Sequence, residues 1–159
     1  MSSTSSILTY PRPLSIVLAD DDTDDREMFA EVIGELNAGI QLTCAEDGMV
    51  LLKLLQATEQ PLPQLIFLDL NMPNKNGKEC LDEIRKSERL KHIPVVIYST
   101  SSSPKDIEDT FEKGANLYVR KPSSFNELRN ITRTVLSLDW NHYRPNALRS
   151  MFVFSNKTN

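Results

Sequence analysis

The stretch Gln64-Leu65-Ile66-Phe67-Leu68-Asp69-Leu70-Asn71-Met72-Pro73-Asn74-Lys75-Asn76-Gly77 sets the architecture that the rest of this chain follows. An apolar run ends abruptly in one carboxylate, Asp69, and a loop with two turn-breaking residues, Pro73 and Gly77, follows it. A short apolar run bounded in this way is typical of a buried strand. Asp69 would then lie at the carboxyl end of the strand, where open α/β sheets place their functional sites.

The same alternation of an apolar run and an amphipathic segment occurs five times along the chain. Besides the run that ends at Asp69, we expect strands at 14–19, 40–44, 95–98 and 116–119. We expect helices at 23–37, 48–58, 78–88, 104–114 and 124–138. Strands that alternate with helices over short connections form a parallel sheet with helices on both faces and right-handed crossovers. The sequence therefore predicts a doubly wound α/β fold.

The length and charge of the chain exclude several classes of protein. At 159 residues it suits one domain, and a formal net charge of −4 without a basic run argues against nucleic acid as a direct partner. No apolar run approaches the ~20 residues that span a bilayer, and residues 1–13 lack the features of a secretory signal. We expect a cytoplasmic protein in which Cys44 and Cys80 are reduced and packed.

Polar residues follow four of the expected strands. They are Asp20 and Asp21, Asp69, Ser99 with Thr100, and Lys121. Each one alone could cap a helix or face water, but in a parallel sheet all four strand ends lie along one edge. Crowded carboxylates resist joint ionisation, and a hard divalent cation such as Mg²⁺ relieves their repulsion. A carboxylate beside such a cation can attack a phosphoryl group, and a lysine and a hydroxyl can bind its oxygens.

Four segments, 16–22, 68–77, 94–100 and 114–122, give the chain a resemblance to a known family. It resembles the receiver domains of two-component response regulators, over about residues 14–138, and in particular the stand-alone receivers of the chemotaxis-regulator type. The resemblance implies a flavodoxin-like (βα)5 fold with a parallel sheet in the strand order 2-1-3-4-5. Segments 68–77 and 114–122 carry the most specific part of this likeness.

The resemblance also implies a role for each strand-end residue. Asp69 would be the phosphoacceptor, and Lys121 and Ser99 would complete the catalytic set by binding the phosphoryl group. The cation, Mg²⁺ or alternatively Mn²⁺, would be held by Asp69, Asp21, Asp20 through water, and the backbone carbonyl of Asn71. Tyr118 matches an aromatic residue whose ring is thought to turn inward when Ser99 moves. The acids Asp22 and Asp25 are interpreted as a helix cap and a first-turn acid, outside the site.

The implied function is a signalling switch and not an enzyme, apart from its own phosphorylation and dephosphorylation. A histidine kinase or a histidine phosphotransfer protein would donate the phosphoryl group, and an unknown downstream protein would bind the switched surface. One alternative is a phosphorylation-independent scaffold on the same fold. Another is a metal-dependent phosphohydrolase, which is disfavoured because Asn71 stands where such enzymes need a general acid.

Two segments lie outside the expected receiver domain. We expect residues 1–13 to form a loose N-terminal arm, and residues 139–159 to form a tail that is too short for an effector domain. The tail contains Trp140, Tyr143, Phe152 and Phe154, although solvated tails are usually poor in aromatic residues. Two interpretations stay open. The tail covers its own last helix, or it docks on another chain, as a homodimer contact or as an added strand.

Overall fold

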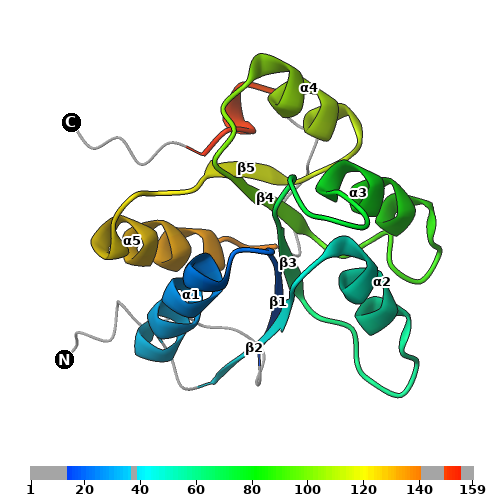
Figure 1. The fold of residues 1–159 in the computed structure, drawn as a ribbon, viewed down its shortest axis with the longest axis horizontal. Helices are drawn as coiled ribbons and strands as arrows, with labels where there is room; N and C mark the ends of the chain where they lie inside the picture. The colour runs from blue at the N-terminus through cyan, green and yellow to red at the C-terminus, as the bar shows by residue number, and fades with distance from the viewer. Residues whose placement is uncertain (1–13, 37–38, 141–148, 155–159) are drawn as a thin grey trace.

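The computed structural model describes residues 14–36, 39–140 and 149–154. At its centre lies a five-stranded parallel sheet in the order β2-β1-β3-β4-β5, which confirms the predicted fold class and strand order (Figure 1). The strands are β1 (Leu14–Ala19), β2 (Ile40–Ala45), β3 (Leu65–Leu68), β4 (Val95–Ser99) and β5 (Leu117–Arg120). Residues of β3 and β4 are buried throughout, as expected for central strands covered on both faces.

Helices cover both faces of the sheet. They are α1 (Thr23–Leu36), α2 (Gly48–Gln56), α3 (Gly77–Lys86), α4 (Pro104–Glu112) and α5 (Phe125–Leu136). Figure 1 shows α1 and α5 together on one side, and α2, α3 and α4 on the other. Ser103 and Ser124 are the N-terminal caps of α4 and α5, and their hydroxyls accept hydrogen bonds from the backbone N–H three residues on. The second to fifth helices each end two residues earlier than the sequence suggested.

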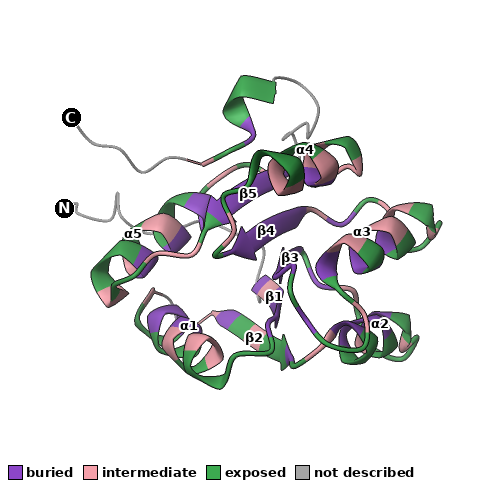
Figure 2. Cartoon of the chain, turned by 45° about the horizontal axis from the view of Figure 1, so that its top comes forward, coloured by how far each residue is buried: buried purple, intermediate pink, exposed green. Residues whose placement is uncertain are grey.

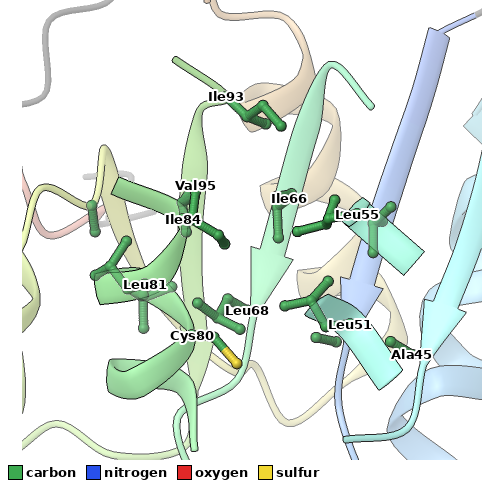
Figure 3. Close-up of a cluster of buried hydrophobic side chains, with 14 of the residues drawn as sticks. Ala45, Leu51, Leu55, Ile66, Leu68, Cys80, Leu81, Ile84, Ile93 and Val95 are labelled. Carbon is green, nitrogen blue, oxygen red and sulfur yellow. The ribbon is translucent and has the colours of Figure 1, made fainter. Parts of the chain in front are cut away.

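Each face of the sheet has its own apolar layer, and Figure 2 shows the buried residues concentrated on the strands and on the inner sides of the helices. On the α1–α5 side, Phe29, Phe67 and Tyr98 meet edge to face, with ring centroids 5.0–6.3 Å apart. On the other side, aliphatic side chains from α2 and α3 pack on β3 and β4 (Figure 3). Cys80 belongs to this second layer, whereas Cys44 is exposed on the edge strand β2, so the prediction that both are packed was wrong for Cys44.

The loop after β3 is held close to the sheet end by a glycine. A Cβ atom at Gly77 would lie 2.2 Å from the carbonyl oxygen of Asp69, so only glycine fits there. The backbone N–H of Gly77 donates to the carbonyl of Leu70 at 2.9 Å and closes the loop. Asn76 then caps α3 with a capping box to Glu79. The loop therefore returns to the sheet at a fixed place beside Asp69.

The described end of the tail packs on the chain's own β5 and α4, where Figure 1 draws it in red. It begins with a short 3-10 turn, Arg149–Met151, and Val153 then forms a parallel bridge with Tyr118. Phe152 is almost fully buried, and the indole N–H of Trp140 donates to the carbonyl of Val135 at 3.0 Å. Tyr143 lies outside the described residues. Contact between this segment and a second chain stays a prediction.

Candidate functional site

The strand-end residues converge because consecutive strands are in register at their carboxyl ends. Asp20 and Asp69 directly follow β1 and β3, Ser99 ends β4, and Lys121 directly follows β5. Backbone hydrogen bonds fix this edge: the N–H of Asp69 donates to Ala19 at 2.9 Å, and that of Lys121 to Ser99 at 2.8 Å. The structure therefore brings these predicted site residues to one edge of the sheet.

The Lys121 ammonium lies at the centre of the cluster, and its side chain is only 8% exposed. Its Nζ is 2.8 Å from Asp20 Oδ2, 3.2 Å from Asp69 Oδ2 and 2.8 Å from Asp25 Oδ2. Burial opposes the charged form, but the close contacts of the ammonium with the Asp20 and Asp25 carboxylates outweigh it and raise the pKa of Lys121 above its ordinary value. Lys121 therefore remains protonated and partly neutralises three acids.

The contact with Asp25 was missed in the sequence interpretation, which treated it only as a first-turn acid. Asp22 does cap α1, since its Oδ1 accepts from the Asp25 N–H at 2.9 Å. However, Asp25 lies one helical turn before Phe29, which is fully buried. This spacing places Asp25 on the inner side of α1, and it is the signal that could have identified it as part of the site.

Three carboxylates at this edge fit a divalent cation. Asp20, Asp21 and Asp69 each offer one oxygen, and these oxygens all lie within 4.8 Å of one another. Asp20 is fully buried; its Oδ1 accepts from the Asp22 N–H at 3.0 Å, but its Oδ2 has no hydrogen-bond donor among the described residues. The Lys121 ammonium lies within ion-pair distance of Oδ2 without a well-directed hydrogen bond. A buried oxygen in this condition is suited to a cation or its bound water.

The charge on Asp20 is costly without a cation. Burial raises its pKa to about 6, against the lowering effect of Lys121 and of the Asp22 N–H. Asp21 is exposed beside it. Asn71 is exposed in the loop that follows Asp69, and its predicted role as a carbonyl ligand stays a prediction. Oxygen donors alone suit Mg²⁺ or Mn²⁺ better than softer metals.

The Ser99 hydroxyl is linked to the loop that leads into α4. Ser99 is fully buried, and its Oγ accepts from the N–H of Ser101 at 3.2 Å. The Ser101 hydroxyl donates to Asp106 at 2.5 Å, and Asp106 is paired with Lys78 of α3 at 2.7 Å. The hydrogen bonds from Lys78 and Ser101 lower the pKa of Asp106. This chain of contacts connects the Ser99 hydroxyl to α3 and α4.

Tyr118 lies beneath this loop. Its ring is buried, and its hydroxyl donates to the carbonyl of Ser101 at 2.8 Å. Burial raises the pKa of Tyr118, so the group acts as a hydrogen-bond donor at neutral pH. Phe152 packs against the ring with centroids 6.1 Å apart. The predicted role of Tyr118 as a moving switch stays a prediction, but its contacts do join the site loop to the tail.

Comparison with known proteins gives consistent results. The family model of the response regulator receiver domain matches residues 16–133. The chain is 34% identical over 120 residues to response regulator Rcp1 of Synechocystis, covering 73% of this chain and 82% of Rcp1. It is 31% identical to the probable methanogenesis regulatory protein FilR2 of Methanothrix harundinacea, covering 85% and 90% of the two chains.

Solved structures show the same similarity. The Mn²⁺-bound form of Rcp1 superimposes with a TM-score of 0.73 at 31% identity, over 83% of this chain and 96% of that one. The phosphorylated cyanobacterial phytochrome response regulator RcpA gives a TM-score of 0.72 at 31% identity, over 77% and 90%. In the described part of this chain, no helix has the length and apolar character needed to cross a membrane.

Proposed function

The chain belongs to the response regulator receiver domain family, and from this premise we propose that it is a stand-alone phosphorylation switch with Asp69 as its phosphoacceptor. The observation that carries the proposal is the placement of Lys121 within 3.2 Å of Asp69 beside two further acids, Asp20 and Asp21. This arrangement supplies both a nucleophile and the charges that a phosphoryl group requires.

The chemistry assigned to each residue follows from its position. A cation held by Asp20, Asp21 and Asp69 would supply positive charge to the phosphoryl oxygens. An Asp69 carboxylate oxygen attacks phosphorus, a P–O bond forms, and the P–N bond to the donor's imidazole breaks, so that the imidazole leaves. Lys121 binds a phosphoryl oxygen as a point charge, and the Ser99 hydroxyl donates to another. The carbonyl of Asn71 would complete the cation's protein ligands.

The same proposal covers location, cation and partners. We expect the protein to act in the cytoplasm and to use Mg²⁺, with Mn²⁺ as a substitute. A histidine kinase or histidine phosphotransfer protein would be the donor. Phosphorylation adds charge at Asp69, draws Ser99 toward it, and thereby shifts the Ser101 loop, Tyr118 and the surface near α4 between two conformations. A downstream protein or a second copy of the chain would read that surface.

The test is the intact mass of the protein after incubation with acetyl phosphate, with and without Mg²⁺. Wild type should gain one phosphoryl group only when the metal is present, and Asp69→Asn should gain none. Asp24→Asn is the matched control, because Asp24 is an exposed acid on the first turn of α1, and it should behave as wild type. No gain by wild type at saturating metal would favour the scaffold, whereas continuous turnover of phosphate esters would favour the phosphohydrolase.

A further inference from the structure

Lys121 has one partner that the proposed phosphorylation chemistry does not use. An ammonium group has three N–H donors, and three carboxylates surround this one. Asp69 is the phosphoacceptor and Asp20 belongs to the cation-binding set. Asp25 is the third, and it comes from the first turn of α1, not from a strand end.

Asp20 contacts Lys121 as an ion pair at 2.8 Å, and of the two well-directed hydrogen bonds that Lys121 donates to carboxylates, the one to Asp25 is the shorter. The distance from Lys121 Nζ is 2.8 Å to Asp25 Oδ2 and 3.2 Å to Asp69 Oδ2. The backbone N–H of Asp25 is itself fixed by the Asp22 cap. The Asp25 side chain is 29% exposed, so it contacts Lys121 and is also partly in contact with solvent. Asp25 is therefore held in place to draw the ammonium toward α1.

We propose that Asp25 is a positioning residue that holds the Lys121 ammonium toward α1 and thereby limits the affinity of the site for a phosphoryl group. The inference rests on the proposed function. When the phosphoryl group arrives on Asp69, its oxygens and the Asp25 carboxylate compete for the same ammonium. The negative charge of Asp25 also repels the phosphoryl group through a partly buried medium, where charges are weakly screened.

A purely local role for Asp25 makes a different prediction. Acids in the first turn of a helix interact favourably with the helix dipole, and Asp24 and Asp25 share that position on α1. Asp24 is exposed, whereas Asp25 contacts Lys121. Replacing either acid with asparagine removes one charge from the same helical turn. Only the Asp25 change should alter the site if the proposal holds.

The first experiment measures the binding of beryllofluoride, a phosphoryl mimic, at saturating Mg²⁺, from the amide signal of Ser101 in NMR spectra. Asp25→Asn should bind it more tightly than wild type, on the order of 3- to 10-fold, because one competing charge close to the anion is gone. Asp24→Asn should stay within about 2-fold, because its charge is solvated and screened.

Each outcome of this titration has a definite meaning. Unchanged or weaker binding by Asp25→Asn, or an equal gain in Asp24→Asn, would overturn the role of Asp25 while leaving the proposed function intact. No binding by wild type would overturn the proposed function and this inference with it. Asp69→Asn should fail to bind and shows that the signal reports the site.

A second experiment needs neither cation nor anion. In metal-free protein, the urea midpoints of wild type, Asp25→Asn, Lys121→Met and the double variant form a double-mutant cycle. Asp25→Asn should shift the urea midpoint relative to wild type. The double variant should differ from Lys121→Met alone by a clearly different amount. Additive shifts would show that Asp25 does not hold Lys121, and would overturn the proposal.

Discussion

Two parts of the molecule meet on β5 and are held together by opposite kinds of interaction. At the carboxyl end of the strand, Lys121 joins three carboxylates that would otherwise repel one another. At the edge of the strand, Tyr118 is covered by Phe152 of the tail, whose backbone carbonyl accepts its N–H at 2.9 Å. The first part is polar and crowded with charge, and the second is apolar with its backbone groups paired.

The difference indicates that the two parts of β5 have different roles: its carboxyl end carries the candidate site, and its edge carries a contact that stabilises the fold. A buried Asp20 with a pKa raised to about 6 destabilises the metal-free fold, which is the cost of keeping a site ready for a cation. The tail, by contrast, buries an aromatic ring and pairs an exposed strand edge, both of which stabilise. Variants in the two regions should therefore change stability in opposite directions.

The largest expected effect is at Phe152. Phe152→Ala removes a ring that contacts Phe111 and Tyr118 with centroids 5.2 and 6.1 Å away, so the free energy of unfolding should fall by roughly 2–4 kcal/mol. The loss cannot exceed the free energy with which the tail docks. Urea denaturation measures it, and Mg²⁺ affinity should be unaffected because the ring contacts of Phe152 are with Phe111 and Tyr118 and not with the cation-binding acids.

Met151→Ala is the control for this change, because Met151 is 61% exposed next to the buried ring. It should alter stability by less than about 0.5 kcal/mol. Equal effects from the two variants would mean that the tail does not hold β5. Truncation after Leu138 also removes Trp140, which donates to Val135, so it should cost at least as much stability as Phe152→Ala. A change in oligomeric state on truncation would support the alternative in which the tail docks on another chain.

A smaller effect of opposite sign is expected at Asp20. In metal-free protein at pH 7, Asp20→Asn should raise the free energy of unfolding by about 2 kcal/mol, because it removes a buried charge whose penalty exceeds its attraction to Lys121. The same variant should bind Mg²⁺ much more weakly. Denaturation with and without the cation checks both parts.

The pH dependence gives this prediction a sign. Because the folded-state pKa of Asp20 is raised from 3.8 to about 6, the folded protein binds this proton more tightly than the unfolded chain. The contribution of Asp20 to stability therefore falls as pH rises from about 4 to about 6 and then levels off. The advantage of Asp20→Asn should grow over the same interval, and a constant advantage across it would contradict the assignment.

The polar end of β5 could be predicted from sequence because a simple rule places it. Parallel strands in register bring their carboxyl ends together, so the positions of Asp20, Asp69, Ser99 and Lys121 at one edge followed from finding the strands. The roles of these residues came from the family resemblance. Asp25 was missed because its contact depends on how α1 is rotated above that edge. The spacing between Asp25 and Phe29 shows that both lie on one face of α1. It identifies Asp25 as a site residue only if that face is also known to lie over the carboxyl ends of the strands.

The apolar edge could be predicted only in part. The aromatic content of the tail indicated that it packs on the chain's own last helix or on another chain, whereas Phe152 packs on α4 and β5. The Phe152 ring packs against Phe111 of α4 and Tyr118 of β5. These two residues come together only when α4 has packed on the sheet. The single bridge of Val153 with Tyr118 involves too few residues to produce the alternating apolar and polar pattern of a strand. Contacts of this kind depend on tertiary packing and not on local pattern.

Tyr118→Phe tests the connection between the two regions. The variant keeps the ring under Phe152 and removes only the hydroxyl that donates to the Ser101 carbonyl, so stability should fall by about 1 kcal/mol. The change should act on the site loop more than on the tail. Urea denaturation measures the loss, and protease susceptibility of the tail should match wild type. Increased cleavage of the tail would show that the hydroxyl, and not the ring, holds it.

The smallest expected effect separates two contributions of Arg149 to tail docking. Its guanidinium lies 5.5 Å from the Phe111 ring centroid and pairs with Glu108 at 3.1 Å, with both side chains more than 40% exposed. Exposed ion pairs contribute little, so Glu108→Gln should lower the free energy of unfolding by less than about 0.5 kcal/mol, and high salt should not increase that loss. Arg149→Ala should cost more, because it also removes the stacking on Phe111 and the side chain that covers Phe152. The two variants could instead lose the same free energy of unfolding, with both losses abolished by salt. In that case the ion pair, and not the contact with the Phe111 ring, would hold this end of the tail. The edge of β5 would then depend on charge, as the carboxyl end of the strand does.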